Sequence, residues 1–297
     1  MMDVDFVPAH LIVIGGSYIG LEFAQMYRRF GAEVTVCEMG PRLIGREDED
    51  VSDEVRAILE REGVTVRTGA TCLSVERQGS GINVGVACDS GVPKMEGSHL
   101  LFATGRTPNT EDLGLDRAGI ATDKRGYISV NDQLETSTPG VYALGDVNGC
   151  GAFTHTAWND YEIVAANLFD GGSRRVTDRI TAYALFTDPP LGRIGMSFNE
   201  ARATGRPLLA AKMLMTRVGR AREAGETQGF MKIVVDAETK RILGAALLGL
   251  SGDEVVQSIL EVMVADAPYT SINRGVHIHP TVSELLPTLL EGLKPLE

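Results

Sequence analysis

The 297-residue sequence lacks any hydrophobic run long enough to cross a membrane. Its longest uninterrupted apolar stretch, residues 242–250, has nine residues and includes two glycines, whereas a membrane helix needs about 20. The N-terminus, MMDVD, carries aspartate where a signal peptide would carry lysine or arginine. These absences predict a soluble, cytoplasmic protein with no membrane partner.

Positive charge is also scarce. The sequence has 40 acidic residues against 28 lysines and arginines, a formal net charge of −12. Nucleic acids and anionic lipids are bound chiefly by excess lysine and arginine. The charge balance therefore predicts no nucleic-acid partner, although it permits a local basic pocket for one small phosphate-bearing ligand.

Cysteine is rare, and its spacing does not match that of a metal site or of a closely spaced redox pair. The four cysteines, Cys37, Cys72, Cys88 and Cys150, form no CxxC or CxxxxC. This spacing excludes a zinc knuckle and a closely spaced redox disulfide within the sequence. Scattered thiols are typical of a reducing compartment.

Short apolar runs alternate with helical patterns in the first hundred residues. Strands are expected at residues 10–14, 33–37 and 64–67. A helix ending at Gly31 and an acidic helix over 47–62 separate them. This order predicts a parallel sheet covered by helices. We take the apolar faces of these helices as Ile19, Phe23, Met26, Tyr27 and Phe30 in the first and Val51, Val55, Ile58 and Leu59 in the second.

The pattern changes twice further along. Strands at 72–76 and 82–87, with Gly79, Gly81 and Gly91 between or after them, predict antiparallel hairpins. A helix is expected over 157–169. The remainder is typical of an α+β domain, with strands at 230–236 and 242–248 and helices at 253–267 and from 281 to about 291.

A glycine-rich turn links the first strand to the first helix. The dinucleotide-binding fingerprint GxGxxG needs glycine at its first, third and sixth positions. Gly15 and Gly20 satisfy the first and sixth positions, and Ser17 departs at the third. Serine is small and can donate a hydrogen bond to phosphate, so the turn still predicts a pyrophosphate site.

Glu38 follows the second strand, 18 residues after Gly20. An acid there accepts hydrogen bonds from both ribose hydroxyls of NAD and repels the 2′-phosphate of NADP. The sequence thus predicts a Rossmann-like α/β domain that prefers NADH over NADPH.

Four motifs in a fixed order carry a family resemblance. They are GGSYIGLE (15–22), ATGRTPN (103–109), YALGDV (142–147) and HPTVSE (279–284), with FTHTAWNDY (153–161) as a further match. In these motifs the chain resembles the pyridine nucleotide–disulfide oxidoreductases, in particular their mercuric-reductase-like and dihydrolipoamide-dehydrogenase-like members.

The resemblance implies three domains. They are an NAD-binding Rossmann-like domain (1–104), the second segment of an FAD-binding domain (105–175) and an α+β dimer-interface domain (176–297). The family's N-terminal FAD strand and CxxxxC disulfide have no counterpart in the sequence. We therefore expect a C-terminal part of a longer enzyme, with an incomplete FAD site.

The resemblance also assigns cofactor contacts by position. Tyr18 matches a tyrosine that covers the flavin, although a helix-start aromatic packed on the sheet would look the same. Glu22 matches an acid that pairs with a lysine beside the flavin, and alone it would favour the helix dipole. Asp146 matches the residue that binds a ribityl hydroxyl, with a simple turn aspartate as the alternative. The expected cofactor-binding residues are Gly15, Gly16, Ser17, Tyr18, Ile19, Gly20, Glu22, Glu38, Gly105, Arg106, Gly145, Asp146 and Ala157.

His279 and Glu284 match a catalytic pair. In the family the histidine reaches across a homodimer to the partner's disulfide as acid and base, and the glutamate orients it. Thiol–disulfide exchange needs such a proton carrier near neutral pH. A helix-capping histidine is the alternative. His277 lies two residues earlier, but no third ligand is evident, so no metal site is expected.

The function implied is an FAD-dependent NAD(P)H oxidoreductase that passes electrons to a small-molecule, disulfide or metal-ion acceptor. The chain ends GLKPLE, without the cysteine pair that ends mercury-specific members. The alternative is a catalytically silent module that binds NAD and dimerises. We also expect a homodimer, because the apolar faces of residues 253–267 and of the last helix (Val282, Leu285, Leu286, Leu289) exceed what one small sheet needs.

Overall fold

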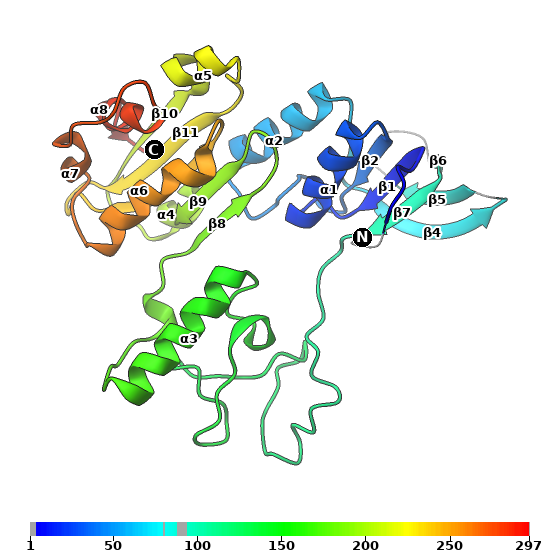
Figure 1. The fold of residues 1–297 in the computed structure, drawn as a ribbon, viewed down its shortest axis with the longest axis horizontal. Helices are drawn as coiled ribbons and strands as arrows, with labels where there is room; N and C mark the ends of the chain where they lie inside the picture. The colour runs from blue at the N-terminus through cyan, green and yellow to red at the C-terminus, as the bar shows by residue number, and fades with distance from the viewer. Residues whose placement is uncertain (1–3, 80, 88–93, 297) are drawn as a thin grey trace. The chain divides into compact units, whose positions relative to one another are not determined.

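The computed structural model describes residues 4–79, 81–87 and 94–296. Its chain forms two compact units (Figure 1). The larger unit joins residues 1–104 with residues 180–297, and the smaller unit consists of residues 105–179. The larger unit thus combines the two segments to which the sequence analysis assigns NAD binding and the dimer interface.

A parallel sheet forms the first half of the larger unit. Its strand order is β3 (Thr65–Arg67), β2 (Glu33–Cys37), β1 (His10–Ile14) and β7 (His99–Phe102). Helices α1 (Tyr18–Arg29) and α2 (Glu49–Arg61) connect its first three strands. The predicted parallel sheet is therefore confirmed. Strand β1 pairs with β2 from His10 opposite Glu33 to Ile14 opposite Cys37.

The two faces of this sheet have different covers. Leu11 and Val13 pack with residues of α1 and α2 in one core cluster. Side chains alternate along a strand, so Ile12 and Ile14 point to the opposite face. They pack there with Val84 and other residues of an antiparallel sheet. That sheet contains β4 (Thr71–Gln78), β5 (Gly81–Ala87) and β6 (Lys94–Gly97), as the hairpin signals predict. The predicted turn at Gly91, and Cys88, lie outside the described residues.

The predicted apolar face of α1 is partly wrong. Ile19 and Phe30 are 43% and 61% exposed, whereas Leu21 and Ala24 are fully buried together with Tyr27. The predicted Tyr27 is buried, and the predicted Phe23 and Met26 pack against the same core cluster. The periodicity therefore included Ile19 and Phe30 wrongly and omitted Leu21 and Ala24. For α2, by contrast, the predicted face is confirmed.

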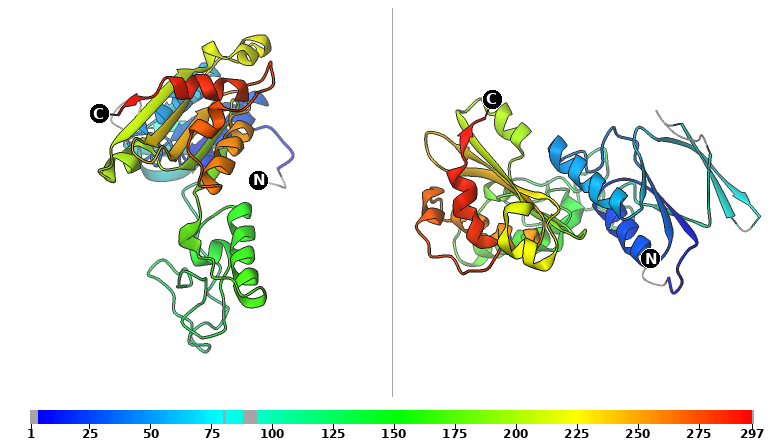
Figure 2. Two further views of the ribbon diagram at one scale, coloured as in Figure 1. Left: turned by 90° about the vertical axis from the view of Figure 1, so that its left-hand side faces the viewer. Right: turned by 90° about the horizontal axis from the view of Figure 1, so that it is seen from above.

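A six-stranded antiparallel sheet forms the other half of the larger unit. Its order is β13 (Lys294–Pro295), β10 (Leu208–Leu214), β11 (Phe230–Asp236), β12 (Ile242–Leu248), β9 (Leu191–Gly195) and β8 (Ala182–Leu185). The predicted strands 230–236 and 242–248 match β11 and β12. Helices α6 (Gly252–Val264) and α8 (Leu286–Glu291) lie along one face of the sheet (Figure 2). The shorter helices are α4 (Phe198–Ala203), α5 (Gly219–Ala224) and α7 (Thr270–Asn273).

The apolar-face argument for a homodimer is wrong. Val255, Val256 and Ile259 of α6, together with Val282, Leu286 and Leu289, are buried in the core of this half. Their cover is the six-stranded sheet, which is larger than the sheet that the sequence patterns showed. The last helix is also shorter than predicted, because a 3-10 turn over Ser283–Leu285 precedes α8. A dimer must therefore rest on other residues.

The smaller unit contains little regular structure. Its long helix α3 (Thr154–Phe169) begins three residues before the predicted start at Ala157. Ile163 and Val164 pack on Leu134, and isolated bridges such as Thr122 with Ile128 hold the loops. A 3-10 turn over Gly145–Asn148 precedes α3.

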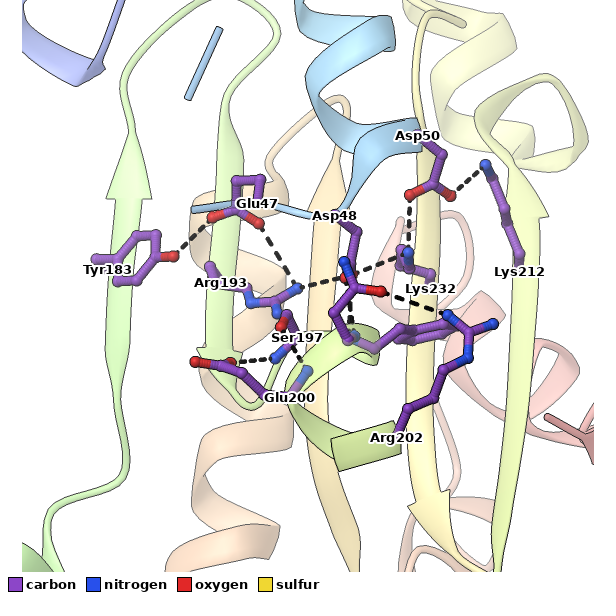
Figure 3. A network of polar contacts seen from close by, with 12 residues as sticks. Glu47, Asp48, Asp50, Tyr183, Arg193, Ser197, Glu200, Arg202, Lys212 and Lys232 are labelled. Carbon is purple, nitrogen blue, oxygen red and sulfur yellow. Dashed lines mark hydrogen bonds and ion pairs between the residues drawn. The ribbon is translucent and has the colours of Figure 1, made fainter. Parts of the chain in front are cut away.

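Buried charges join the two halves of the larger unit. The second face of the six-stranded sheet packs on α1 and α2, and Leu191, Phe230 and Leu248 belong to the same core cluster as those helices. Within this interface Asp48, the N-cap of α2, lies 3.0 Å from Lys232 Nζ on β11. Figure 3 shows the surrounding network, in which Lys232 also reaches Asp50 at 2.8 Å.

Asp48 is held by backbone as well as by charge. Its carboxylate accepts hydrogen bonds from the amides of Phe198 and Asn199, at the start of α4, at 3.1 and 3.2 Å. Burial alone would raise the pKa of Asp48, but these amides and the Lys232 ammonium outweigh it and hold the pKa below its ordinary value. Asp50 has a lowered pKa for the same reasons: Lys212 and Lys232 outweigh its burial.

This network predicts a specific loss of stability in acid. A carboxyl whose pKa is lower in the folded state stabilises the fold above the unfolded pKa of about 4 and loses that contribution as pH falls through the folded pKa. We expect Asp48→Asn to lower the free energy of unfolding by about 3 kcal/mol at pH 7. Urea unfolding from pH 5 to pH 2.5 should show a shallower pH dependence for this variant than for the wild type.

Asp53→Asn provides the control, because Asp53 is an exposed aspartate on the same helix. It should change the free energy of unfolding by no more than about 0.5 kcal/mol. An equal pH dependence for wild type and Asp48→Asn would contradict the assigned role of Asp48.

Candidate functional site

The glycine turn is shaped by close backbone contacts. Gly15 follows β1 with φ +113°, and a Cβ at Gly15 would lie 2.4 Å from the carbonyl oxygen of Ala103. A Cβ at Gly20 would lie 2.1 Å from the carbonyl oxygen of Gly15. Neither position can hold a larger residue without moving the backbone. The first and sixth glycines of the fingerprint are thus required for the turn and for the approach of α1 to β1.

Gly16 is a third glycine with no room for a side chain, although it is not a fingerprint position. A Cβ there would lie 2.5 Å from Leu43 Cδ2 and 2.9 Å from Glu38 Cβ. Ser17, at the third fingerprint position, is exposed and is the N-cap of α1. Its side chain makes no capping hydrogen bond within the described structure. The departure from glycine at position 17 therefore creates no steric conflict in this turn.

The first turn of α1 faces outward at Ser17 and Ile19, which are both exposed. Backbone N–H groups in the first turn of a helix have no intrahelical partners, and the helix dipole favours an anion there. α1 has no acidic residue in this turn to compete with such an anion. The geometry fits a phosphate-bearing ligand.

Glu38 lies against the glycine turn. Its Oε2 accepts a hydrogen bond from the Gly16 amide at 2.7 Å, and its Oε1 accepts one from the Gly40 amide at 2.7 Å. Two amides thus fix the carboxylate at the end of β2, next to the backbone that would contact a pyrophosphate. Arg42 points to Glu49 of α2, with Nη1 3.1 Å from Oε1, and Arg46 is exposed.

Tyr18 and Glu22 make contacts that the sequence did not indicate. The Tyr18 hydroxyl donates to Glu47 Oε1 at 3.1 Å, and Glu22 Oε1 accepts a hydrogen bond from the Phe186 amide at 2.9 Å. Both contacts reach residues that sequence reasoning missed. Glu47 was taken only as the start of a helix, and no local pattern links Phe186 to α1.

The other candidate flavin contacts lie in the smaller unit. Gly145 has φ +77°, and a Cβ there would lie 3.2 Å from Ala157 Cβ. Asp146 is exposed, with Oδ2 3.8 Å from Arg106 Nη1. Gly105 has φ +129°, with no described atom within 4 Å of its Cβ position. Four of the predicted residues therefore form two neighbouring pairs, Gly145 with Ala157 and Asp146 with Arg106.

Asp160 supports this turn and was missed by the sequence analysis. It is 1% exposed, and its Oδ2 accepts hydrogen bonds from the Gly145 amide and from Asn148 Nδ2, both at 2.8 Å. Arg179 pairs with its other oxygen. The signal was present in the FTHTAWNDY motif, but only the fold shows that this aspartate faces inward.

His279 and Glu284 are in direct contact. His279 Nδ1 lies 2.8 Å from Glu284 Oε2, and the histidine side chain is 79% exposed while the glutamate is 16% exposed. A neutral ring that donates its Nδ1 proton to the glutamate carries its lone pair on Nε2. The pair can therefore accept or deliver a proton at Nε2 at the protein surface.

His277 is engaged elsewhere. Its Nε2 lies 3.0 Å from the carbonyl oxygen of Ile272. Across the described ranges no three histidine, cysteine, aspartate or glutamate side chains are grouped so that they could hold a metal ion. In the same ranges every helix is too short or too polar to span a lipid bilayer.

Comparison with known proteins places this geometry in a family. Residues 2–160 match the model of the pyridine nucleotide-disulphide oxidoreductases, and residues 181–290 match the dimerisation domain of the same family. The chain therefore belongs to the pyridine nucleotide-disulphide oxidoreductase family.

Two curated relatives have similar sequences. The probable pyridine nucleotide-disulfide oxidoreductase RclA of Escherichia coli (strain K12) is 35% identical over 99% of this chain and 66% of its own length. The dihydrolipoyl dehydrogenase of Thermus scotoductus is 35% identical over 97% of this chain and 62% of its own length. The chain thus spans slightly less than two thirds of these relatives.

Solved structures show the same fold. The HOCl-induced flavoprotein disulfide reductase RclA from Escherichia coli matches with a TM-score of 0.91 and 34% identity, over 98% of this chain and 66% of its own. LpdA from Mycobacterium tuberculosis matches with a TM-score of 0.89 and 26% identity, over 97% and 62% of the two chains.

The close contact at Gly20 predicts that alanine is not tolerated there. Gly20→Ala forces the Gly15 carbonyl or the start of α1 to move, and overpacking of this kind costs about 1–3 kcal/mol. Urea unfolding should show that loss. Gly219→Ala is the matched control, because no described atom lies within 4 Å of its Cβ position and its φ is ordinary. Equal stabilities of the two variants would refute the steric argument.

Proposed function

We propose that this chain carries the nicotinamide-nucleotide site, part of the flavin site and the dimer interface of an FAD-dependent NAD(P)H oxidoreductase. The proposed segments are residues 1–104 for NAD, 105–175 for FAD and 176–297 for the interface. Bound NADH supplies a hydride and bound FAD relays electrons to an acceptor. The acceptor class is a disulfide or another small molecule, including a metal ion, and the proposed location is the cytoplasm.

The glycine turn with Glu38 is the observation that carries this proposal. Gly15, Gly16 and Gly20 leave no room for side chains, so the backbone itself forms the surface beside the first turn of α1. Glu38 is fixed by the Gly16 amide at the position where a ribose would follow a pyrophosphate. This arrangement supports the proposal that the turn binds the adenosine diphosphate part of a dinucleotide.

Residues of the smaller unit fit a flavin contact. Asp146 is an exposed acceptor on a turn whose backbone is fixed by Asp160 through the Gly145 amide. Gly145 and Ala157 keep this surface free of larger side chains. We propose that Asp146 accepts a hydrogen bond from a ribityl hydroxyl and that Gly105 and Arg106 lie beside it.

His279 is the proposed acid–base residue. The Glu284 carboxylate lies within hydrogen-bond distance of Nδ1 and orients the ring. The ring is on the surface, where a group from a second subunit or a substrate can approach it. We propose that His279 Nε2 exchanges a proton with a thiol produced by reduction of the acceptor.

A nucleotide-binding, dimerising module without turnover is the second candidate. This candidate needs only the glycine turn and the segment that matches the family's dimerisation domain. The absorbance spectrum of the purified chain separates the two candidates. Bound flavin at one equivalent per chain supports the oxidoreductase, and NADH binding without flavin supports the silent module.

The position of Glu38 predicts a preference for NADH. We expect fluorescence titration of the purified chain to give a Kd for NADH about tenfold lower than for NADPH, because the Glu38 carboxylate repels a 2′-phosphate. Glu38→Gln should reduce this ratio to about threefold or less. Glu33→Gln, at the opposite end of the same strand β2, should leave the ratio unchanged.

Failure of both nucleotides to bind would contradict the proposed function itself. Tighter binding of NADPH would contradict only the assigned role of Glu38, and would indicate that Arg42 or Arg46 reaches the 2′-phosphate.

We further propose a homodimer that uses the segment around His279. Val276 and Ile278 are exposed apolar residues, at 101% and 78%, and the match to the family's dimerisation domain covers them. In an isologous interface the same patch lies on both subunits, so each substitution is present twice. Ile278→Asp should therefore raise the dimer dissociation constant at least about 100-fold, because burying an unpaired charge is costly.

Sedimentation equilibrium at micromolar concentration checks this expectation. The control is Leu113→Asp, which alters an exposed apolar residue of the smaller unit. It should leave the dimer intact. A monomeric wild-type chain would contradict the proposed homodimer.

A further inference from the structure

Tyr18 links the glycine turn to the α+β half of the larger unit. Its backbone forms the first turn of α1, and its hydroxyl donates to Glu47 Oε1. The hydroxyl of Tyr183, on β8, donates to the same oxygen at 2.6 Å. The two tyrosine rings meet edge to face, with centroids 5.5 Å apart. Glu47 therefore accepts one hydrogen bond from each half of the unit.

The Glu47 carboxylate is fixed from its other side as well. It is 2% exposed, and its Oε2 lies 3.6 Å from Arg193 Nη1 on β9. Figure 3 shows this contact between Glu47 and Arg193. Burial raises the pKa of both Tyr18 and Tyr183, and the charge of Glu47 raises it further. Both hydroxyls therefore remain protonated donors at neutral pH.

Beyond Tyr18, the same face of α1 contacts residues 186–188. Glu22, Gln25 and Arg29 follow Tyr18 at intervals of four, three and four residues, which places them on one side of the helix. Glu22 accepts from the Phe186 amide, Gln25 exchanges two hydrogen bonds with the Asp188 backbone at 2.7 and 2.8 Å, and Arg29 lies 2.6 Å from Asp188 Oδ2.

The loop that contains Glu47 also touches the glycine turn directly. The Ile44 amide donates to the Gly16 carbonyl oxygen at 2.8 Å, and the Glu47 amide donates to the Ile44 carbonyl oxygen at 2.8 Å. Leu43 packs over Gly16. Glu47 thus connects the glycine turn, the loop after β2 and strand β8.

We propose that Glu47 and Tyr183 are positioning residues for the dinucleotide site, and that they hold Tyr18 so that the first turn of α1 is ordered before the ligand arrives. This inference rests on the proposed function. Neither residue belongs to the glycine fingerprint, and Tyr183 comes from the α+β half. Binding loses affinity when a ligand must first order the groups that contact it. The α+β half thereby sets nucleotide affinity through one carboxylate oxygen.

A pair of substitutions at one position separates the hydrogen bond from the charge. Glu47→Gln and Glu47→Met both remove the negative charge beside Arg193, but only glutamine keeps a polar group that the tyrosine hydroxyls can bond. We expect Glu47→Met to raise the Kd for NADH about fivefold, equivalent to about 1 kcal/mol. Glu47→Gln should stay within about twofold of the wild type.

Three further variants test the role of each half. Tyr183→Phe removes the β8 donor and should raise the Kd for NADH about threefold. Tyr269→Phe, a partly buried tyrosine in the same half, should leave it unchanged. In the double variant Tyr18→Phe with Glu47→Met, the Kd should equal that of Glu47→Met alone, because both changes break the same hydrogen bond.

All titrations use the purified 297-residue chain, well below the melting temperature of each variant as measured by circular dichroism. If Glu47→Met does not fold, Tyr183→Phe and the Tyr269→Phe control decide the matter. A wild-type chain that does not bind NADH would overturn the proposed function. A wild type that binds NADH, together with a folded Tyr183→Phe variant of unchanged Kd, would overturn this inference alone. Equal weakening by Glu47→Gln and Glu47→Met would overturn it as well, because charge rather than the hydrogen bond would then matter.

Discussion

The buried ion pair between Asp48 and Lys232 is the interaction on which the larger unit depends. It joins the N-terminus of α2 to strand β11, at the interface where the six-stranded sheet packs on α1 and α2. A buried pair of this kind adds little net stability compared with an apolar interface, because both charges must leave water. Its value lies in specificity. With the Phe198 and Asn199 amides also bound to Asp48, any shift between the two halves leaves a buried charge without compensation.

That fixed interface also determines which side chains surround the glycine turn. Glu47 precedes Asp48 in the chain, so the same contact that fixes the start of α2 also brings the Glu47 carboxylate to Tyr18 and Tyr183. The turn itself is determined by steric exclusion at Gly15, Gly16 and Gly20. Backbone shape and side-chain support thus come from different parts of the sequence. Ser17 fits because its position faces outward, which explains how a departure from the fingerprint leaves the turn intact.

The candidate chemical groups are distributed between the two compact units. The glycine turn and the His279–Glu284 pair belong to the larger unit, and Asp146 with its supporting Asp160 belongs to the smaller one. Each group is held in position by local hydrogen bonds: Glu38 by two amides, His279 by one carboxylate and the Gly145 turn by Asp160. Where a cofactor performs the electron chemistry, positioning of this kind is the protein's contribution.

Features that depend on neighbours along the chain could be predicted from the amino-acid sequence. Strands β11 and β12, the parallel β1–β2 pair, the glycine turn and Glu38 beside it follow from local periodicity and from the steric needs of a tight turn. The contact between His279 and Glu284 also lies within five residues. Family motifs added the candidate flavin residues, which neither periodicity nor spacing would identify.

Which polar and apolar groups are buried became clear from the folded chain alone. Asp48 and Lys232 are 184 positions apart, and Tyr18 and Tyr183 are 165 apart, so no local pattern marks them as partners. Periodicity also misassigned Ile19 and Phe30 at α1, and it showed no surface to cover the apolar residues of α6 and α8. The physical reason is the same in each case. A side chain's burial, and whether a charge is stabilised there, depends on the surface that packs against it, and that surface comes from distant parts of the chain.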